Sequence, residues 1–396
     1  MPAPLLLDLT HTSHTRARTG IQRVTRSLHA ALGERALAIT HDPHAGAWRP
    51  VETWELANLS APGAGTKRGA KWPLAAQIRG RVRRWFGRSS ALNDQLSSLN
   101  SSGLIVPEVF SPAVATALPP LFAATQGARV ALFHDAIALK YPELTPTKTV
   151  ARFPAYLHEL LAFDGIAAVS ADSRDSLVDY WRWLGVRETP PVEAIPLGVD
   201  QRRAPMGATP KPGESPVVLC VGSLEGRKNH LALLDACELL WTRGARFELR
   251  LVGLAQPDTG RAAAAGVRAL QAAGRRLRFD GPLGDDGVDA AYAACTVTVY
   301  PSLIEGFGLP VLESLAHGKP CICSAQGALG ESARGGGCIA LDAVTAPNLA
   351  GAISRLLDTP GELAALSAAA RARKLRTWSD YAHALAGWMG TLPRRS

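Results

Sequence analysis

The sequence predicts a two-domain α/β protein in which each domain is a doubly wound parallel sheet. Buried-strand patterns alternate with helical patterns along the chain, as expected for parallel sheets covered by helices. This alternation of strand and helix patterns is interrupted once, by a stretch rich in proline and glycine, and then resumes. The 396 residues are also more than one ordinary hydrophobic core accommodates.

The first domain is expected to cover residues 1–197. It opens with an apolar run, then a polar loop with a glycine, and then apolar residues at helical spacing. The predicted strands are 5–9, 103–106, 128–133 and 165–169, and the predicted helices are 21–32, 150–163 and 173–184.

The second domain repeats this pattern after a predicted linker at 198–216. It is expected to cover residues 217–377, and a last helix within 378–396 is expected to pack back on the first domain. The predicted strands are 217–221, 247–252, 277–279, 296–300 and 320–323, and the predicted helices are 231–241, 288–294 and 308–316.

Composition favours a globular protein of the cytoplasm. Hydrophobic residues make up 47% of the chain, and no apolar run reaches the about 20 residues that a membrane-spanning helix needs. The amino terminus lacks the basic leader of a signal peptide. The six cysteines lack the spacing of a zinc or redox site, so we expect reduced core thiols at Cys220, Cys237, Cys295, Cys321, Cys323 and Cys338.

Positive charge is concentrated at residues 67–88. This stretch holds eight Lys or Arg residues and no acidic residue, against a net charge of +9 for the whole chain. Aromatic and aliphatic residues are interleaved with the charges, which suits an anionic membrane surface. A solvated basic helix or loop is the alternative. No nucleic-acid recognition motif accompanies the charge, so we expect no nucleic-acid partner.

The most specific pattern lies between a strand ending at Tyr300 and a helix starting near Gly308. The loop between them carries Glu305, and Glu313 follows on the helix. Glycines let a ligand approach the backbone, and free N–H groups at a helix start bind anions and hydroxyl oxygens. Two carboxylates in this setting can bind the hydroxyls of a sugar and a ribose. An ordinary capped helix is the alternative.

Two adjacent cations, Arg227 and Lys228, lie in a loop that begins at Gly222, after the first strand of the second domain. Arginine can bind a diphosphate through two hydrogen bonds, and lysine binds it as a point charge. Positive groups placed there would stabilise the negative charge that grows on a leaving nucleotide diphosphate. A surface Arg-Lys pair is the alternative.

Two segments of the first domain hold further candidates. Gly20 precedes the first helix, where a sugar or phosphate can approach the backbone, and Arg23 follows it. His134 and Asp135 end a predicted strand. A histidine there can orient a sugar or move a proton, or it can simply form a hydrogen bond at the strand end.

Together these segments resemble the family-4 retaining glycosyltransferases. The motifs that carry the resemblance are Glu-x7-Glu at 305–313, Gly-x-Leu-x-x-x-Lys-Asn at 222–229, Gly-Ile-x-Arg-Val at 20–24, His-Asp at 134–135 with Tyr-Pro-Glu at 141–143, and Val-Ser-x-x-Ser at 169–173. Gly226 stands where the family usually has proline. The resemblance implies the GT-B fold, in which two Rossmann-like domains face each other across a cleft.

The resemblance also implies roles for the matched residues. The catalytic residues would be His134, Arg227, Lys228 and Glu305, with Glu305 facing the donor sugar. Glu313 would bind the ribose hydroxyls. Other donor contacts would come from Gly20, Gly222, Leu283, Gly306, Phe307, Gly308 and Leu309, and acceptor-side contacts from Arg23, Asp135 and Ser173.

The activity that the resemblance implies is retaining hexosyl transfer. No metal is expected, since no Asp-x-Asp motif is present. No cofactor is expected either. The motifs resemble bacterial mannosyl- and rhamnosyltransferases of surface polysaccharide and lipopolysaccharide assembly. GDP-mannose is the expected donor, with dTDP-rhamnose or a UDP-sugar as alternatives. The expected acceptor is a saccharide or lipid-linked saccharide at the inner face of the cytoplasmic membrane. A sugar-nucleotide epimerase and a non-catalytic carbohydrate-binding protein stay open as other classes.

Overall fold

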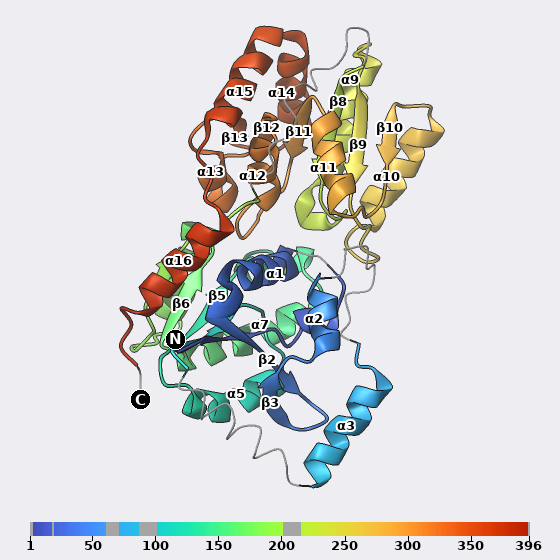
Figure 1. Ribbon diagram of the computed structural model, residues 1–396. Helices are drawn as coiled ribbons and strands as arrows, with labels where there is room; N and C mark the ends of the chain where they lie inside the picture. The colour runs from blue at the N-terminus through green and yellow to red at the C-terminus, as the bar shows by residue number, and fades with distance from the viewer. Residues whose placement is uncertain (1–2, 18–19, 61–70, 87–100, 201–214, 395–396) are drawn as a thin grey trace. The chain divides into compact units, whose positions relative to one another are not determined.

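The computed structural model describes residues 3–17, 20–60, 71–86, 101–200 and 215–394 (Figure 1). The chain divides into two compact units. The first contains Met1–His134, Arg152–Leu197 and Trp378–Ser396, and the second contains Asp135–Ala151 and Gly198–Thr377. Most of the predicted linker lies outside the described residues, as do Lys67, Arg68 and Arg88 of the basic stretch.

The first unit is built on a seven-stranded sheet with the order β3-β2-β1-β4-β5-β6-β7. Neighbouring strands are parallel except for β2 and β3, which pair antiparallel at one edge. The four strands predicted for this half are present, and the edge pair β2–β3 and the strand β7 were not predicted. The strands are β1 (Leu5–Asp8), β2 (Ala36–Asp42), β3 (Ala47–Pro50), β4 (Gly103–Val106), β5 (Ala128–Phe133), β6 (Gly165–Ala168) and β7 (Val192–Ala194).

Helices of the first unit flank its sheet, whereas α3 lies at the margin of the unit beside β3 (Figure 1). In α1 the apolar residues at helical spacing, Val24, Leu28 and Leu32, are buried. The last helix, α16, packs against α1 and near β5, within this unit. The helices are α1 (Gly20–Leu32), α2 (Thr53–Ser60), α3 (Leu74–Trp85), α5 (Pro112–Ala124), α7 (Thr147–Glu159), α8 (Ala171–Trp183) and α16 (Trp378–Met389).

Residues 135–151 group with the second unit, although the sequence prediction placed them within the first domain. This segment contains α6 (Ile137–Lys140), a short 3-10 helix at Pro142–Leu144 and the first turn of α7. This segment begins directly where β5 ends. The pattern of strands and helices in the sequence therefore does not indicate a boundary between the two units at this position.

The second unit is built on a six-stranded parallel sheet with the order β10-β9-β8-β11-β12-β13. This is the strand order of a Rossmann-type sheet, and the order reverses between β8 and β11. Ligands of such sheets bind beyond the carboxyl ends of the strands at this reversal. The strands are β8 (Val217–Val221), β9 (Glu248–Val252), β10 (Leu277–Phe279), β11 (Val297–Tyr300), β12 (Cys321–Ser324) and β13 (Cys338–Leu341).

Side chains of this sheet alternate between two apolar layers, as the period of two in a strand requires. On β8, Val218 and Cys220 join the layer under α9, α10 and α14, while Leu219 joins the layer under α11. All six cysteines are free, and Cys338 is the least buried of them. The helices of this unit are α9 (His230–Thr242), α10 (Arg261–Ala272), α11 (Asp285–Ala294), α12 (Leu309–Ala316), α13 (Gly327–Ala333), α14 (Ala346–Asp358) and α15 (Pro360–Ala372).

No helix among the described residues combines the length and the apolar character that a membrane crossing requires.

Candidate active site

The loops that follow β8 and β11 meet at the reversal point of the second sheet. Because β8 and β11 are adjacent and parallel, their carboxyl ends open at the same edge. There the Glu305 carboxylate forms ion pairs with Arg227 (Nη1 to Oε2, 2.6 Å) and Lys228 (Nζ to Oε1, 2.6 Å). A backbone hydrogen bond from Leu303 N–H to the Arg227 carbonyl (2.9 Å) joins the two loops. The structure thus brings together three of the four predicted catalytic residues.

The local backbone explains how two consecutive cations reach one carboxylate. Residues Gly226–Lys228 form one turn of 3-10 helix, and Asn229 then adopts a left-handed conformation with φ of 54° before α9 begins. The Asn229 side chain donates to the Val344 carbonyl (2.8 Å), which holds this strained residue in place. At Gly222 the aliphatic chain of Lys228 passes 3.7 Å from the position that a Cβ would occupy, which is an ordinary van der Waals contact.

The charges of this cluster are largely shielded from water, because the side chains of Glu305 and Lys228 are 10% and 9% exposed. Burial raises the pKa of Glu305, but Arg227 and Lys228 outweigh it and hold the pKa at about 2. Burial lowers the pKa of Lys228, while Glu305 opposes that shift. Arg227 also pairs with Glu225 (2.8 Å). Glu305 is therefore an anion at neutral pH, held between two cations.

Tyr300, the last residue of β11, contacts Lys228 of this cluster. Its hydroxyl accepts a hydrogen bond from Lys228 Nζ, which also lies 4.5 Å from the centre of the Tyr300 ring. Burial raises the pKa of Tyr300 well above its ordinary value, so the phenol stays neutral. A neutral acceptor orients the lysine without adding another negative charge.

The glycine loop before α12 has the geometry of a ligand-binding helix start. Gly308 has φ of 106°, and a Cβ there would lie 3.1 Å from Leu329 Cδ2 and from Ser332 Oγ, so glycine is favoured. The Ser332 hydroxyl donates to the Phe307 carbonyl (2.7 Å) and fixes the loop. Leu309 is the first residue of α12, where backbone N–H groups lack partners within the helix.

Two other predicted donor contacts occupy neighbouring elements. Glu313 is buried on α12, and its Oε2 accepts a hydrogen bond from the Tyr292 hydroxyl of α11 (3.2 Å). The Tyr292 ring stacks on His317 with centroids 4.8 Å apart. Leu283 is half-buried and packs with Tyr292 in an apolar layer of this unit. Both residues have contacts within the protein, and these contacts do not test the predicted roles in ligand binding.

The fourth predicted catalytic residue, His134, belongs to the first unit at the end of β5. Its Nε2–H donates to the Pro107 carbonyl (2.7 Å), and its own carbonyl accepts from the Ser173 hydroxyl (3.0 Å). Ser173 is held in turn by Ser170, the N-cap of α8, whose Oγ accepts from Ser173 N–H (3.1 Å). These contacts fix the position of the imidazole at the strand end.

Three remaining predicted contacts lie at helix starts. The Asp135 carboxylate accepts from Ile137 N–H (3.0 Å) before α6, and so serves at least as a turn-forming residue. Gly20 is the exposed first residue of α1, with open space where a Cβ would be. Arg23 is half-buried one turn later. None of these contacts identifies a ligand.

Comparison with known proteins extends these observations. The family model described as glycosyl transferases group 1 matches residues 215–359, which include Arg227, Lys228, Glu305 and Glu313. Residues 215–359 therefore correspond to a glycosyl transferases group 1 domain. The resemblance to the family-4 glycosyltransferases that the motifs predicted is thereby confirmed.

Curated proteins similar to this chain include two from Escherichia coli. O-antigen chain mannosyltransferase B is 30% identical over 241 residues, which cover 55% of this chain and 59% of that protein. Serotype-specific mannosyltransferase WbdA is 25% identical over 334 residues, which cover 80% of this chain and 38% of that protein. The D-inositol 3-phosphate glycosyltransferase of Acidothermus cellulolyticus is 36% identical over 179 residues, 43% of this chain and 40% of that protein. The chain covers less than two thirds of each relative's length.

Solved structures match the fold along nearly the whole chain. Sucrose-phosphate synthase from Thermosynechococcus elongatus has a TM-score of 0.69 at 20% identity and covers 97% of this chain and 98% of that one. Anabaena Alr3699/HepE in complex with UDP and glucose has a TM-score of 0.70 at 15% identity and covers 98% and 100%. At these identities the likeness shows the fold, and the predicted class of two Rossmann-like α/β units, GT-B, is confirmed.

Outside the group 1 domain, the first sheet has a polar cluster that the sequence prediction missed. β1 and β4 are adjacent and parallel, so their carboxyl ends also meet. Glu108, after β4, accepts from the backbone N–H groups of His11 and Thr12 (both 3.1 Å) and from the Thr12 hydroxyl. Asp8, at the end of β1, accepts from Thr10 N–H (2.9 Å). Both carboxylates are buried. The sequence prediction placed Asp8 within the first strand and assigned no role to Glu108.

The Asp8 carboxyl is expected to make the stability of the first unit depend on pH. Burial raises its pKa from 3.8 to about 7, so the folded state keeps a proton that the unfolded chain loses. Stability should therefore fall as the pH rises from about 4 to about 7, by up to about 4 kcal/mol from this group alone. Asp8→Asn should flatten this slope, because asparagine stays neutral and keeps the oxygen that accepts from Thr10.

Urea unfolding of the wild type and Asp8→Asn at pH 4.5 and pH 7.5 would test this expectation. Glu108, whose pKa burial also raises, remains in both proteins and contributes to the residual slope. An unchanged difference between the two pH values in the variant would contradict the account.

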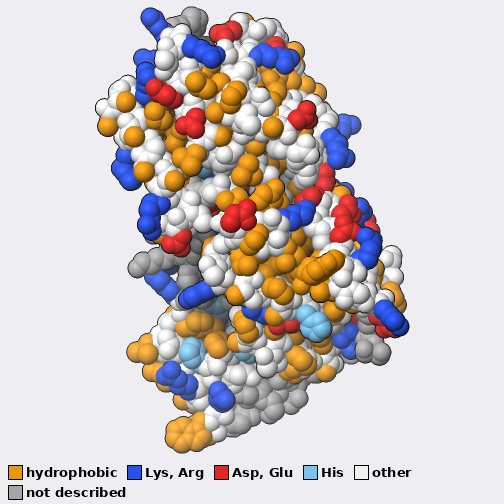
Figure 2. All heavy atoms as spheres, turned by 180° about the vertical axis from the view of Figure 1, so that it is seen from behind, with side chains coloured by type: hydrophobic (Ala, Val, Ile, Leu, Met, Phe, Trp, Pro, Cys, Tyr) orange, Lys and Arg blue, Asp and Glu red, His pale blue; other side chains and the backbone are white. Residues whose placement is uncertain are grey.

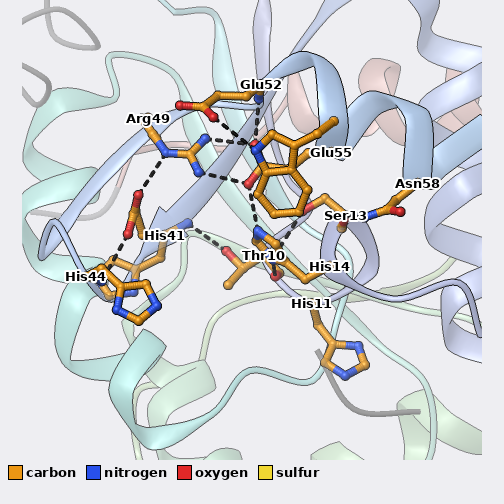
Figure 3. Close-up of polar contacts among 12 residues, drawn as sticks. Thr10, His11, Ser13, His14, His41, His44, Arg49, Glu52, Glu55 and Asn58 are labelled. Carbon is orange, nitrogen blue, oxygen red and sulfur yellow. Dashed lines mark hydrogen bonds and ion pairs between the residues drawn. The ribbon is translucent and has the colours of Figure 1, made fainter. Parts of the chain in front are cut away.

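A second buried polar network lies under α2 and the edge pair β2–β3 (Figure 3). The Glu55 carboxylate accepts from both terminal nitrogens of Arg49 (2.8 and 2.9 Å) and from His14 Nε2 (2.6 Å). Arg49 also donates to Asp42 (3.1 Å), and His14 Nδ1 contacts the Thr10 carbonyl (2.5 Å). The four ionisable side chains come from η1 (Thr12–His14), β2, β3 and α2, so the network ties these elements together.

Within the described residues, no group of three or more His, Cys, Asp or Glu side chains is arranged to hold a metal ion.

Proposed function

We propose that this chain is a metal-independent, retaining glycosyltransferase that moves mannose from GDP-mannose to a saccharide or lipid-linked saccharide in bacterial surface polysaccharide synthesis. The cluster of Arg227, Lys228 and Glu305 at the reversal point of the second sheet is the observation that carries the proposal. Two cations are placed where Rossmann-type sheets bind phosphates, and an ionised carboxylate beside them can accept hydrogen bonds from sugar hydroxyls.

In the proposed reaction, an acceptor hydroxyl attacks the anomeric carbon from the face that the diphosphate leaves. The bond between the anomeric carbon and the phosphate oxygen breaks, and the hydroxyl proton passes to that oxygen. Arg227 and Lys228 stabilise the charge that grows on the diphosphate, a task that falls to a metal ion in other enzymes. Glu305 orients the sugar, and a trapped covalent sugar on Glu305 would contradict this mechanism.

The donor and acceptor are proposed from the names of the relatives. The two Escherichia coli relatives are mannosyltransferases, and one of them acts on an O-antigen chain. This supports mannose as the sugar and a growing polysaccharide as the acceptor. A UDP-sugar is the second candidate, because a solved structure with the same fold holds UDP and glucose. A dTDP-rhamnose donor remains a further alternative from the sequence motifs.

We further propose that the enzyme works in the cytoplasm at the inner face of the cytoplasmic membrane, where a lipid-linked acceptor would be found, and that it has no nucleic-acid partner.

A transfer assay tests this proposal. Labelled GDP-mannose, UDP-glucose and dTDP-rhamnose would each be incubated with the protein and with extracted lipid-linked saccharides, and the product linkage would be determined by NMR. An α-linked mannose on a saccharide is the expected product. A sugar-nucleotide stereoisomer formed without any acceptor would indicate an epimerase, and no product from any donor would support a non-catalytic binding protein.

A further inference from the structure

Helix α3 exposes an apolar stripe to solvent. Leu74, Ile78, Val82 and Trp85 recur at spacings of three or four residues, so they share one side of the helix. They are 69%, 52%, 44% and 87% exposed, and Phe86, which follows the last turn, is 72% exposed. A surface helix of a globular protein normally turns such a stripe toward its core.

The opposite side of α3 faces the body of the first unit. Ala76 and Gly80 are its buried residues. A Cβ on Gly80 would lie 2.7 Å from the Cβ of His44 and 3.1 Å from the backbone nitrogen of Ala45, so the helix approaches the β2–β3 turn as closely as its backbone allows. The small residues thus form the contact with the protein, and the large apolar residues point away from it.

Arginines border the apolar stripe on both sides. At about 100° per residue, Arg81 and Arg84 fall on one flank, and Arg79 and Arg83 on the other. Arg79 and Arg83 pair with Glu52 at 2.7 and 3.3 Å, whereas Arg81 and Arg84 line a shallow hollow with Pro43, His44 and Trp85. Figure 2 shows hydrophobic side chains beside Lys and Arg side chains on this part of the surface.

The start of α3 is fixed to the buried network beneath it. Trp72, two residues before the helix, stacks on His14 with ring centroids 4.0 Å apart and meets His44 edge-on at 5.3 Å. The backbone N–H of Lys71 donates to the His14 carbonyl (2.8 Å). The helix is therefore held against the unit at its start and at Gly80, with its stripe directed outward.

We propose that α3 is an interfacial anchor that lies in the plane of an anionic phospholipid surface. Leu74, Ile78, Val82, Trp85 and Phe86 would enter the boundary between headgroups and acyl chains, and the flanking arginines would bind lipid phosphates. The excess of positive charge favours an anionic membrane over a second copy of this basic chain, whose matching surface would be repelled. This inference does not depend on the proposed reaction.

Flotation with lipid vesicles tests the apolar stripe. The full chain should bind vesicles of phosphatidylcholine with phosphatidylglycerol and bind pure phosphatidylcholine vesicles much more weakly. The double variant Ile78→Ser with Trp85→Ser should lose at least about 10-fold in partitioning. Trp183→Ser with Leu184→Ser is a matched control, because Trp183 and Leu184 are 79% and 51% exposed at the carboxyl end of α8 in the same unit.

A charge variant tests the flanking arginines. Arg81→Gln with Arg84→Gln should weaken binding to the anionic vesicles by about 30-fold, while Arg243→Gln with Arg246→Gln, which removes the same charge from exposed positions elsewhere, should change it little. Failure of the wild type to bind anionic vesicles, or equal losses in the stripe variant and its control, would overturn the proposal. Conversion of a dimer to a monomer by the stripe variant, without vesicle binding, would instead identify a second copy as the partner.

Discussion

Lys228→Ala should reduce kcat for sugar transfer by about 100- to 1,000-fold, the effect of removing one preorganised group from a developing negative charge. Lys228 is the more buried of the two cations, lies 2.6 Å from Glu305 and donates to the Tyr300 hydroxyl, so its charge is held at a fixed position. Single-turnover measurements with saturating donor would separate this loss from weaker binding. Lys374→Ala, which removes an exposed lysine of the same unit, is the control and should retain full activity.

The fold should survive this change, which makes the result interpretable. In Lys228→Ala the Glu305 carboxylate keeps its ion pair with Arg227 at 2.6 Å, so the substitution does not leave an unpaired buried charge. A folded variant with a kcat within threefold of the wild type would contradict the assigned role of Lys228. A variant that fails to fold would be replaced by Lys228→Gln, which preserves most of the packing.

Glu55→Ala should lower the free energy of unfolding by about 3–5 kcal/mol, the usual cost of removing one partner from a buried ion pair. The Glu55 side chain is fully buried, and its loss would leave Arg49 and His14 without their shared acceptor. Because the pairing lowers the pKa of Glu55 to about 2, its stabilising contribution is present above about pH 4.5 and is lost as the pH falls toward 2.

Glu52→Ala is the matched control for this change. Glu52 lies three residues earlier and pairs with Arg79 and Arg83, but its side chain is 25% exposed. Such surface pairs contribute at most about 1 kcal/mol. Urea unfolding at pH 7 of both variants would measure the difference, and equal losses for Glu52→Ala and Glu55→Ala would show that burial of the network contributes nothing.

The site in the second unit was predictable from sequence because its chemistry lies in two short loops at strand ends. Arg227 and Lys228 follow one strand, Glu305 follows another, and the strand order of a Rossmann-type sheet brings these two ends together. The order of the strands alone was enough to predict that these two loops lie close together. Glu313 and Leu283 were predicted by the same motifs, but the structure shows only their packing partners.

The clusters in the first unit were not predictable in this way. Asp42, Arg49 and Glu55 come from an edge pair and a helix that show no clear periodic pattern in the sequence, and their partner His14 lies far away along the chain. The one available signal was the run of polar residues after β1, at the end of a buried strand. Similarly, the sequence showed that residues 67–88 are basic and aromatic, but only the burial of Gly80 showed which face of α3 points outward.

A thermal-shift panel with GDP, UDP, dTDP and their sugar conjugates tests the central claim most directly. A ligand that binds only the folded state at 100 times its dissociation constant stabilises it by about 2.7 kcal/mol. We expect GDP and GDP-mannose to raise the Tm of the wild type and to do so much less for Lys228→Ala. A shift with UDP or dTDP compounds alone would keep the site and replace the donor, whereas no shift with any of them at millimolar concentration would contradict the proposal that Arg227, Lys228 and Glu305 form a nucleotide-sugar site.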